Sequence, residues 1–293
     1  MSTETVDPRY SQIDRLPTNE AVEIMLEGQR AAIAALASQT SAIAAAAEAA
    51  AARLGATGRL AYAGAGTSGR VGVQDGVELT PTYGWPEARL HFFLAGGMDA
   101  LMRAVEGAED DAADARHQVA QAALGPQDVL VGIAASGRTP FTIGAIEEAR
   151  ARGALTIAIA NNAGTPLLAA ADHAILLDTG SEAIAGSTRM GAGTSQKAAL
   201  NLLSTAIMLR LGLVFRGLMV NMRISNAKLR LRAQAMVSEI AGVDEAAADA
   251  ALDAAGGDIR RAILHALGLS AEQAEARLVD ARDFHEVLRG LID

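Results

Sequence analysis

The chain has 293 residues and a formal net charge of −9, which argues against a nucleic-acid-binding protein. It contains no cysteine, so disulfides, cysteine-ligated zinc and thiol catalysis are excluded. Hydrophobic residues make up 51% and aromatic residues only 3%, so a large core has to be built from Ala, Leu, Ile and Val. This length suits one large α/β domain with a small appendage.

The N-terminal region predicts an irregular segment followed by helices. Residues 1–18 are polar and lack the basic and apolar segments of a secretory signal, so we expect a cytoplasmic protein. Residues 18–54 predict helices that end at Gly55 and Gly58. The Ala-rich stretch at 31–52 contains too many polar residues to cross a bilayer, so no membrane association is expected.

Short apolar segments alternate with helical patterns through the middle of the chain. The expected strands are residues 60–63, 90–94, 129–134, 156–160 and 174–177. The expected helices are residues 67–77, 99–124, 140–152, 165–170 and 193–213. This alternation predicts an α/β fold in which helices cover both faces of a parallel sheet. Ligands of such sheets bind beyond the carboxyl ends of the strands.

The composition changes after about residue 240. No strand pattern follows, and Gly256 and Gly257 interrupt Ala-rich helical sequence. Helices are expected at residues 243–255, 259–267 and 271–291. We therefore predict two domains, an α/β domain at residues 1–240 and a small three-helix domain at residues 241–293.

Three loops rich in glycine and hydroxyl residues each follow a predicted strand, at residues 64–70, 135–140 and 186–197. Such loops offer backbone N–H groups, hydroxyls and the positive end of a helix dipole, which suit a phosphate. In the first loop, Gly64, Gly66 and Gly69 match the dinucleotide-binding pattern. The second strand, however, lacks a terminal carboxylate to hold a ribose. A phosphorylated small molecule is therefore favoured over NAD, and a structural turn is the remaining alternative.

The second loop strengthens the phosphate interpretation. Ser136 and Thr139 place two hydroxyls at a helix start, and Pro140 suits the first helical position. The alternative is that Ser136 only caps the helix.

Carboxylates supply the candidate acid–base groups. Glu78 lies among apolar and hydroxyl residues just before Pro81, where partial burial would suit a proton donor. A surface turn is the alternative. Glu106 and Glu109 are three apart on a predicted helix and so share a face, although such acidic runs are usually solvated. The five histidines have no partner at metal-ligand spacing, so we expect no metal and no cofactor.

Together, these motifs resemble the N-acetylmuramic acid 6-phosphate etherase family, from Ile13 to the C-terminal helices. The matching segments are Gly64-Ala-Gly-Thr-Ser-Gly-Arg70, Glu78 with Pro81-Thr-Tyr-Gly84, Ala95-Gly-Gly97, Ala104-Val-Glu-Gly-Ala-Glu-Asp110, Gly132-Ile-Ala-Ala-Ser-Gly-Arg-Thr-Pro140 and Gly186-Ser-Thr-Arg-Met190. The resemblance implies a flavodoxin-like sandwich with a five-stranded parallel sheet of the sugar isomerase type, a small helical C-terminal domain and a homodimer. It also implies cleavage of the D-lactyl ether of N-acetylmuramic acid 6-phosphate in cell-wall sugar recycling.

The resemblance assigns roles to individual residues. It places the proton donor on Glu78 and a second active-site glutamate on Glu109. It implies phosphate contacts from Thr67, Ser68, Ser136, Gly137 and Thr139, and other substrate contacts from Gly66, Glu106 and Ser187. The chain departs from the family pattern at Val77, where serine is frequent, and at Gly191, where lysine is common.

Two other functions fit a phosphosugar site. An aldose–ketose isomerase would need one base and no acid for a leaving group at C3. A phosphosugar-sensing regulator would need no catalytic carboxylate. The presence of both glutamates favours the etherase over either alternative.

Overall fold

The computed structural model describes residues 1–103, 105–281 and 283–292. The chain forms two compact units, residues 1–76 with 88–206, and residues 77–87 with 207–293. Two helices, α3 (Gly66–Tyr83) and α7 (Gly191–Arg210), begin in the first unit and end in the second. The expected domain boundary at residue 240 stays a prediction.

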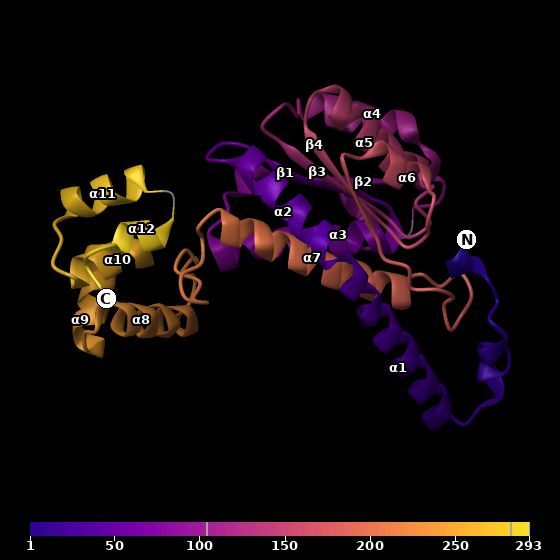
Figure 1. Cartoon of the computed structure of the whole chain (residues 1–293), viewed down its shortest axis with the longest axis horizontal. Helices are drawn as coiled ribbons and strands as arrows, with labels where there is room; N and C mark the ends of the chain where they lie inside the picture. Colours follow the sequence, from indigo (N-terminus) through magenta and orange to yellow (C-terminus); the bar gives the residue numbers. More distant parts are fainter. Residues whose placement is uncertain (104, 282, 293) are drawn as a thin grey trace. The chain divides into compact units, whose positions relative to one another are not determined.

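The first unit is built on a five-stranded parallel sheet (Figure 1). Its strands are β1 (Leu60–Gly64), β2 (Leu90–Leu94), β3 (Val129–Ala134), β4 (Leu155–Ala160) and β5 (His173–Leu176). They lie in the order β2-β1-β3-β4-β5, and each neighbouring pair is parallel. This is the flavodoxin-like order, so the predicted fold class is confirmed.

Helices cover both faces of this sheet. Figure 1 shows α4, α5 and α6 on one face, and α2 with α3 and α7 on the other. The bounds are α1 (Thr18–Ala34), α2 (Thr40–Leu54), α4 (Ala112–Gln121), α5 (Pro140–Ala151) and α6 (Pro166–Ala170). Short 3-10 turns lie at Ser2–Glu4, Pro8–Tyr10, Ile13–Arg15, Ala35–Gln39, Glu87–Arg89, Met98–Leu101 and Ala108–Asp110.

Small residues let α5 approach the sheet closely. Ala61, Ala63 and Ala158 belong to the buried cluster on the α5 side. A Cβ atom on Gly132 of β3 would lie 2.7 Å from Ile146 on α5, closer than carbon atoms pack. The low aromatic content of the sequence therefore agrees with the structure, in which small residues let the helix and the sheet pack closely.

Two helix predictions need correction. The helix expected at 99–124 is correct only for α4, because Gly107 adopts a left-handed φ of 73° and Asp111 starts α4 by capping the N–H of Asp114. Glu106 and Glu109 therefore do not share a helical face. Conversely, α3 continues past residue 77 to Tyr83 with Pro81 inside it, so the segment of Glu78 is helical rather than a turn.

The second unit contains the C-terminal helices. They are α8 (Ala227–Ala241), α9 (Glu245–Ala254), α10 (Ile259–Ala266), α11 (Ala271–Asp280) and α12 (Phe284–Leu288). Their shared core includes Phe215, Met236, Leu252, Ile263 and Phe284. The single helix expected at 271–291 is divided, because Asp283 caps a new helix by accepting the N–H of Glu286. None of the described helices is long and apolar enough to cross a membrane.

Candidate active site

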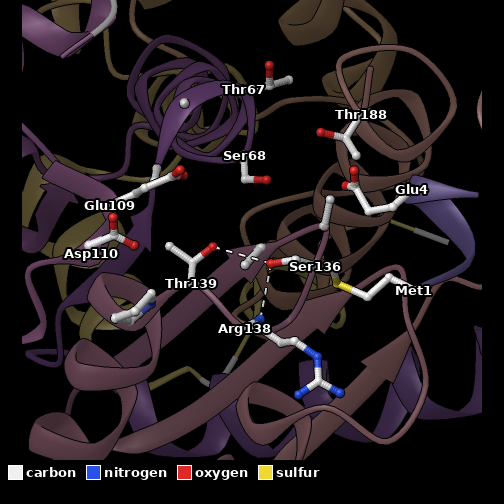
Figure 2. A pocket seen from close by; sticks show the side chains of 15 residues that line it. Met1, Glu4, Thr67, Ser68, Glu109, Asp110, Ser136, Arg138, Thr139 and Thr188 are labelled. Carbon is white, nitrogen blue, oxygen red and sulfur yellow. Dashed lines mark hydrogen bonds between the residues drawn. The ribbon is translucent and has the colours of Figure 1, made fainter. Parts of the chain in front are cut away.

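A cavity of about 420 Å³ lies at the carboxyl edge of the sheet in the first unit (Figure 2). The loops after β1 and β3, the turn at Ala108–Asp110 and the N-terminal segment surround it. Its lining residues are Met1, Glu4, Ala65, Gly66, Thr67, Ser68, Glu109, Asp110, Ala134, Ala135, Ser136, Arg138, Thr139, Pro140 and Thr188. The position matches the edge at which ligands of open α/β sheets bind.

The loop after β1 is shaped by backbone-to-backbone packing. A Cβ on Gly69 would lie 2.8 Å from the carbonyl oxygen of Gly64, so a side chain at this position would force the turn open. Gly66 has a left-handed φ of 53°. This turn places Thr67 and Ser68 at the start of α3, where both line the cavity.

The loop after β3 leaves hydrogen-bond donors available to a ligand. The Ser136 Oγ accepts the N–H of Arg138 at 3.1 Å and lies 3.5 Å from the Thr139 Oγ1. Because the Ser136 oxygen already accepts a bond, its hydroxyl hydrogen can be donated into the cavity. Thr139 is the N-cap of α5 but makes no side-chain capping bond. The start of α5 therefore keeps unoccupied N–H groups and the positive end of its dipole.

Gly137 shapes this loop and is not among the residues that line the cavity. Its φ is 63°, and a Cβ would lie 2.3 Å from the Thr165 Oγ1. Only glycine fits there, so its local role is to allow the turn that exposes Ser136 and Thr139.

A buried polar chain holds Ser68 in place. The Ser68 Oγ donates to the Gln196 Oε1 at 3.0 Å, and the Gln196 Nε2 donates to the Asn161 Oδ1 at 2.9 Å. The Asn161 Nδ2 then donates to the Ser195 Oγ at 2.9 Å. The chain joins α3 and α7 to the loop after β4. Sequence reasoning missed it, although Asn161 directly follows β4 at the same edge of the sheet.

The third hydroxyl-rich loop is arranged differently. Glu182 is only 4% exposed, and its Oε2 and Oε1 accept the N–H groups of Gly191 and Ala192, each at 2.8 Å. The start of α7 therefore binds a carboxylate from its own chain and does not offer the phosphate site that its sequence suggested. Thr188 of this loop lines the cavity, whereas the predicted Ser187 does not.

Gly191, a departure from the family pattern, lies within this cap. A Cβ there would come within 3.1 Å of the Glu182 Oε2. A side chain at this position would therefore press on the capping carboxylate.

The predicted glutamates take different positions. Figure 2 shows Glu109 on the opposite side of the cavity from Glu4, with Ser68, Ser136 and Thr139 between them. Glu106 lines a smaller adjacent cavity of about 200 Å³, which shares Gly66 and Glu109 with the first. The segment before Glu106 is held by Arg70 on α3, whose guanidinium donates to the carbonyls of Ala100 and Arg103.

Glu78 lies outside this constellation. It is exposed on α3, belongs to the second unit and is not among the described residues that line the cavity. The first unit thus brings Glu109 together with the predicted phosphate-binding hydroxyls but does not bring Glu78 to them.

The N-terminal segment was not expected at the site. Thr3 is completely buried; its Oγ1 accepts from the Asn162 Nδ2 at 3.1 Å, and its carbonyl accepts the N–H of Gly186 at 3.0 Å. These contacts carry Met1 and Glu4 to the cavity. No local signal in the sequence could have shown this, because the contacts join residues far apart in the chain.

The charges around the cavity indicate how an anion would be held. Glu4, Glu109 and Asp110 contribute three carboxylates, and Arg138 contributes one guanidinium, which Figure 2 shows directed away from the labelled hydroxyls. A phosphate in this space would be bound by the hydroxyls of Ser136 and Thr139 and by helix starts that each carry about +0.5 charge, whereas the hydroxyl hydrogen of Ser68 is already donated to Gln196. Lysine or arginine contacts are not needed for this type of site.

A buried carboxylate anchors α3 behind the cavity. Asp75 accepts from the Tyr62 Oη at 2.9 Å, the Asn201 Nδ2 at 2.8 Å and the Ser204 Oγ at 3.1 Å. Burial raises the pKa of Asp75, and these hydrogen bonds offset that rise only in part. Burial and the nearby Asp75 charge also raise the pKa of Tyr62. Asp75 thus ties the helix that presents Thr67 and Ser68 to β1 and α7.

The site offers hydroxyl, backbone and carboxylate groups for chemistry. Among the described residues, no group of three or more histidine, aspartate or glutamate side chains is arranged to hold a metal ion. What the cavity can do is bind an anion at the helix starts and exchange protons through Glu109.

Comparison with known proteins places this arrangement among sugar-phosphate domains. The model of the glucokinase regulatory protein N-terminal SIS domain matches residues 41–150, and that of the SIS domain matches residues 107–206. A protein of Deinococcus radiodurans named N-acetylmuramic acid 6-phosphate etherase is 48% identical, with 95% of this chain and 92% of the relative covered. A Streptomyces avermitilis protein of the same name is 44% identical, over 97% of this chain and 92% of the relative.

A solved structure agrees with the fold. This is a Bacteroides fragilis protein whose name proposes a phosphosugar isomerase involved in capsule formation. It aligns with a TM-score of 0.53 at 19% identity, covering 69% of this chain and 95% of that chain. At this identity the likeness concerns the architecture of the sheet and its helices alone.

Proposed function

The chain belongs to the N-acetylmuramic acid 6-phosphate etherase family, and on this basis we propose that it cleaves the D-lactyl ether of N-acetylmuramic acid 6-phosphate. The products are N-acetylglucosamine 6-phosphate and D-lactate. The observation that carries the proposal is the match to named etherases over almost the whole chain. The cavity supports it, because hydroxyls suited to a phosphate lie beside a carboxylate there.

The substrate phosphate occupies the space between Ser68, Ser136 and Thr139. Thr67 completes the contacts, and Gly137 allows the turn that exposes Ser136 and Thr139. The starts of α3 and α5 stabilise its charge. Because the phosphate is remote from the reacting carbons, its binding energy serves to position the sugar for reaction. Gly66 contacts the rest of the sugar in this arrangement, and Glu106 meets it from the adjacent cavity that shares Gly66 and Glu109 with the first. Ser187, which lines neither cavity, is left without a contact.

The reaction proceeds by elimination followed by addition. An alkoxide leaves an unactivated carbon slowly, but opening of the sugar ring gives a C1 aldehyde that acidifies the proton on C2. A base removes this proton, a C2–C3 double bond forms, and the C3–O bond breaks with its electron pair going to the lactyl oxygen. An acid protonates that oxygen. Water then adds its hydroxyl to C3 and a proton to C2, which gives the product sugar.

Two carboxyl groups in different protonation states suit these steps. Glu109, beside the hydroxyls of the cavity, is the base that removes the C2 proton. Glu78 is the acid that protonates the lactyl oxygen. Loop and helix N–H groups stabilise the negative charge of the enolate.

The active form is a homodimer, which α1 supports. Of its 17 residues only Ala32 is buried, whereas Val22, Leu26 and Ile33 are 52%, 48% and 46% exposed. A helix with exposed apolar residues gains stability by packing against another chain. We expect the same association to supply Glu78 of one copy to the cavity of the other.

The activity is tested with purified protein and N-acetylmuramic acid 6-phosphate. We expect D-lactate and N-acetylglucosamine 6-phosphate in equal amounts, and a sugar product made in D₂O should carry deuterium at C2. A ketose phosphate without lactate would instead establish the isomerase. Lactate release without deuterium at C2 would exclude elimination while leaving the overall activity intact.

Sharing of the site between subunits is tested by mixing two inactive variants, Glu78→Gln and Glu109→Gln. If each site uses one glutamate from each copy, hybrid dimers have one intact site, and an equal mixture recovers roughly a quarter of wild-type activity. If both glutamates come from the same copy, every site keeps one defect and the mixture stays inactive.

The expected cytoplasmic location stays a prediction.

A further inference from the structure

A second cavity, of about 470 Å³, lies entirely within the second unit. The turn at Gly84, residues 220–224 and the turn at residues 256–260 before α10 form its walls. None of the residues to which the proposed reaction gives a role lines it. Its volume falls in the range of small-molecule sites.

Backbone contacts fix the walls of this cavity. The Asn221 Nδ2 donates to the carbonyl of Tyr83, and the N–H of Arg223 donates to the carbonyl of Pro81 at 3.2 Å. Gly84 has a φ of 65°, and a Cβ there would lie 2.4 Å from the carbonyl oxygen of Asn221. The two segments are therefore packed together closely, and the cavity is a built feature of the unit.

The charged groups in this cavity are mainly cationic. Arg223 and Arg260 both line it, and the Nε of Arg260 is buried without a hydrogen-bond partner in the described part of the chain. Arg223 is paired only weakly, because its contact with Glu87 spans 3.7 Å between side chains that are 55% and 79% exposed. The carboxylate of Asp258 is used elsewhere, since it caps α10 by accepting the N–H of Arg261 at 3.0 Å.

The Arg260 guanidinium at this cavity favours a ligand that supplies a hydrogen-bond acceptor. A buried guanidinium N–H without a partner is unfavourable, and native structures seldom leave one. The guanidinium fork matches the oxygens of a phosphate or a carboxylate in two-point contacts.

We propose that this cavity binds a small molecule carrying a phosphate or carboxylate group, held by Arg223 and Arg260. The cavity is larger than either group alone, so the ligand has room for a sugar-sized body as well. The inference concerns a site separate from the cavity at the sheet edge and does not rest on the proposed reaction.

Calorimetric titration of the full chain tests this second site. The background is the double variant Ser136→Ala, Thr139→Ala, which weakens the first cavity, and the probes are inorganic phosphate, N-acetylglucosamine 6-phosphate and D-lactate. We expect this background to retain saturable binding of at least one probe. Adding Arg260→Gln should weaken that binding about tenfold or more, as expected for loss of a charge-assisted contact. Preference for phosphate probes or for D-lactate identifies the anionic group.

Arg261→Gln is the matched control. Arg261 is the next residue of α10, carries the same charge and pairs with Glu275 at 2.6 Å. It does not line the cavity, and its contact with the lining carboxylate of Asp258 is long, at 4.0 Å. Its replacement should leave anion binding unchanged. Arg223→Gln provides a second test that does not disturb α10, in case Arg260→Gln fails to fold. Absence of saturable binding in the background, or equal affinity in the Arg223, Arg260 and Arg261 variants, would overturn the proposal.

Discussion

The starts of α5 and α7 differ in what accepts the hydrogen bonds of their N-terminal N–H groups. Both helices follow loops rich in glycine and hydroxyl residues, and both have N-terminal N–H groups that need acceptors. At α5, Thr139 makes no capping bond and the adjoining space is a cavity. At α7, the Glu182 carboxylate accepts two of these N–H groups. The first arrangement leaves room for an external anion, whereas the second supplies an internal one.

The comparison shows that loop composition alone does not define a phosphate site. Whether a helix start binds a ligand depends on whether another segment of the chain supplies a carboxylate first. Glu182 can remain buried because two charge-assisted hydrogen bonds and the helix dipole compensate for its lost hydration. This gives the two regions different expected sensitivities, catalysis and affinity at α5 and stability at α7.

The largest effect is expected at Glu109, the carboxylate of the open cavity. Glu109→Gln should lower kcat about 10²–10⁴-fold, the usual contribution of one proton-transfer group, without changing the unfolding midpoint. Steady-state kinetics of lactate release and thermal unfolding measure the two quantities. Asp110→Asn, which removes the neighbouring carboxylate of the same cavity, is the control and should retain most activity. A Glu109 variant within tenfold of wild type would remove its role as base.

Glu182→Gln should lower the stability of the chain, in contrast to Glu109→Gln, which should lower kcat. The variant keeps one accepting oxygen but places an NH₂ group where the second backbone N–H needs an acceptor, so unfolding should become easier by about 2–3 kcal/mol. Urea unfolding with an unchanged m-value measures this loss. Glu4→Gln, a change of the same type at an exposed residue of the cavity, should leave stability unchanged. If Glu182→Gln matched the wild-type midpoint, α7 would not need the cap.

The sequence predicts the sheet well because its signals are local. Buried parallel strands are continuous apolar segments, and all five strands lie within about one residue of their expected positions. The first two loops were predicted for a similar reason, since each needs a left-handed residue, Gly66 or Gly137, and glycine at such a position is visible in the local sequence. The break at Gly107 was missed because the helix-forming residues around it outweighed a single glycine.

The rest of the site depends on contacts that sequence patterns do not contain. Glu182 reaches its N–H partners only because the chain turns back between residues 182 and 191. Thr3 meets Asn162 from a distance of 159 residues in the chain, which brings Glu4 to the cavity. Glu78 was assigned through family resemblance, and its exposed position on α3 follows from a helix that continues through a proline. Tertiary packing decides each of these features.

A smaller effect is expected at the hydroxyls that we propose to bind the phosphate. Ser136→Ala should raise KM about 5–10-fold with little change in kcat, because it removes one hydrogen bond to a group remote from the reacting carbons. Ser195→Ala is the contrasting variant, since Ser195 is buried and bonds Asn161 rather than lining the cavity. It should lower stability and raise KM less than Ser136→Ala does, because it acts on the cavity only through Asn161, Gln196 and Ser68. A kcat defect without a KM change in Ser136→Ala would argue against phosphate binding there.

The smallest effect concerns the pH dependence of stability at Asp75, a buried carboxylate that, unlike Glu182, accepts only side-chain donors. Its pKa is raised by burial, so the protonated form is favoured in the folded chain. Its contribution to stability is therefore full below the unfolded pKa of about 3.9 and is lost as pH rises through the folded pKa. Asp75→Asn should gain stability relative to wild type across that interval, by less than about 1 kcal/mol.

Asp128 supplies the control of opposite sign. Burial alone would raise the pKa of Asp128, but hydrogen bonds from the side chain and backbone of Arg59 and from the N–H of Gly125 outweigh it and lower the pKa. The contribution of Asp128 is present above its unfolded pKa and is lost as pH falls through the folded pKa. Relative to wild type, Asp128→Asn should therefore be least stable near neutral pH. Urea unfolding from pH 4 to 8 should give diverging profiles for the two variants, and parallel profiles would show that the pKa of Asp75 is not raised in the folded chain.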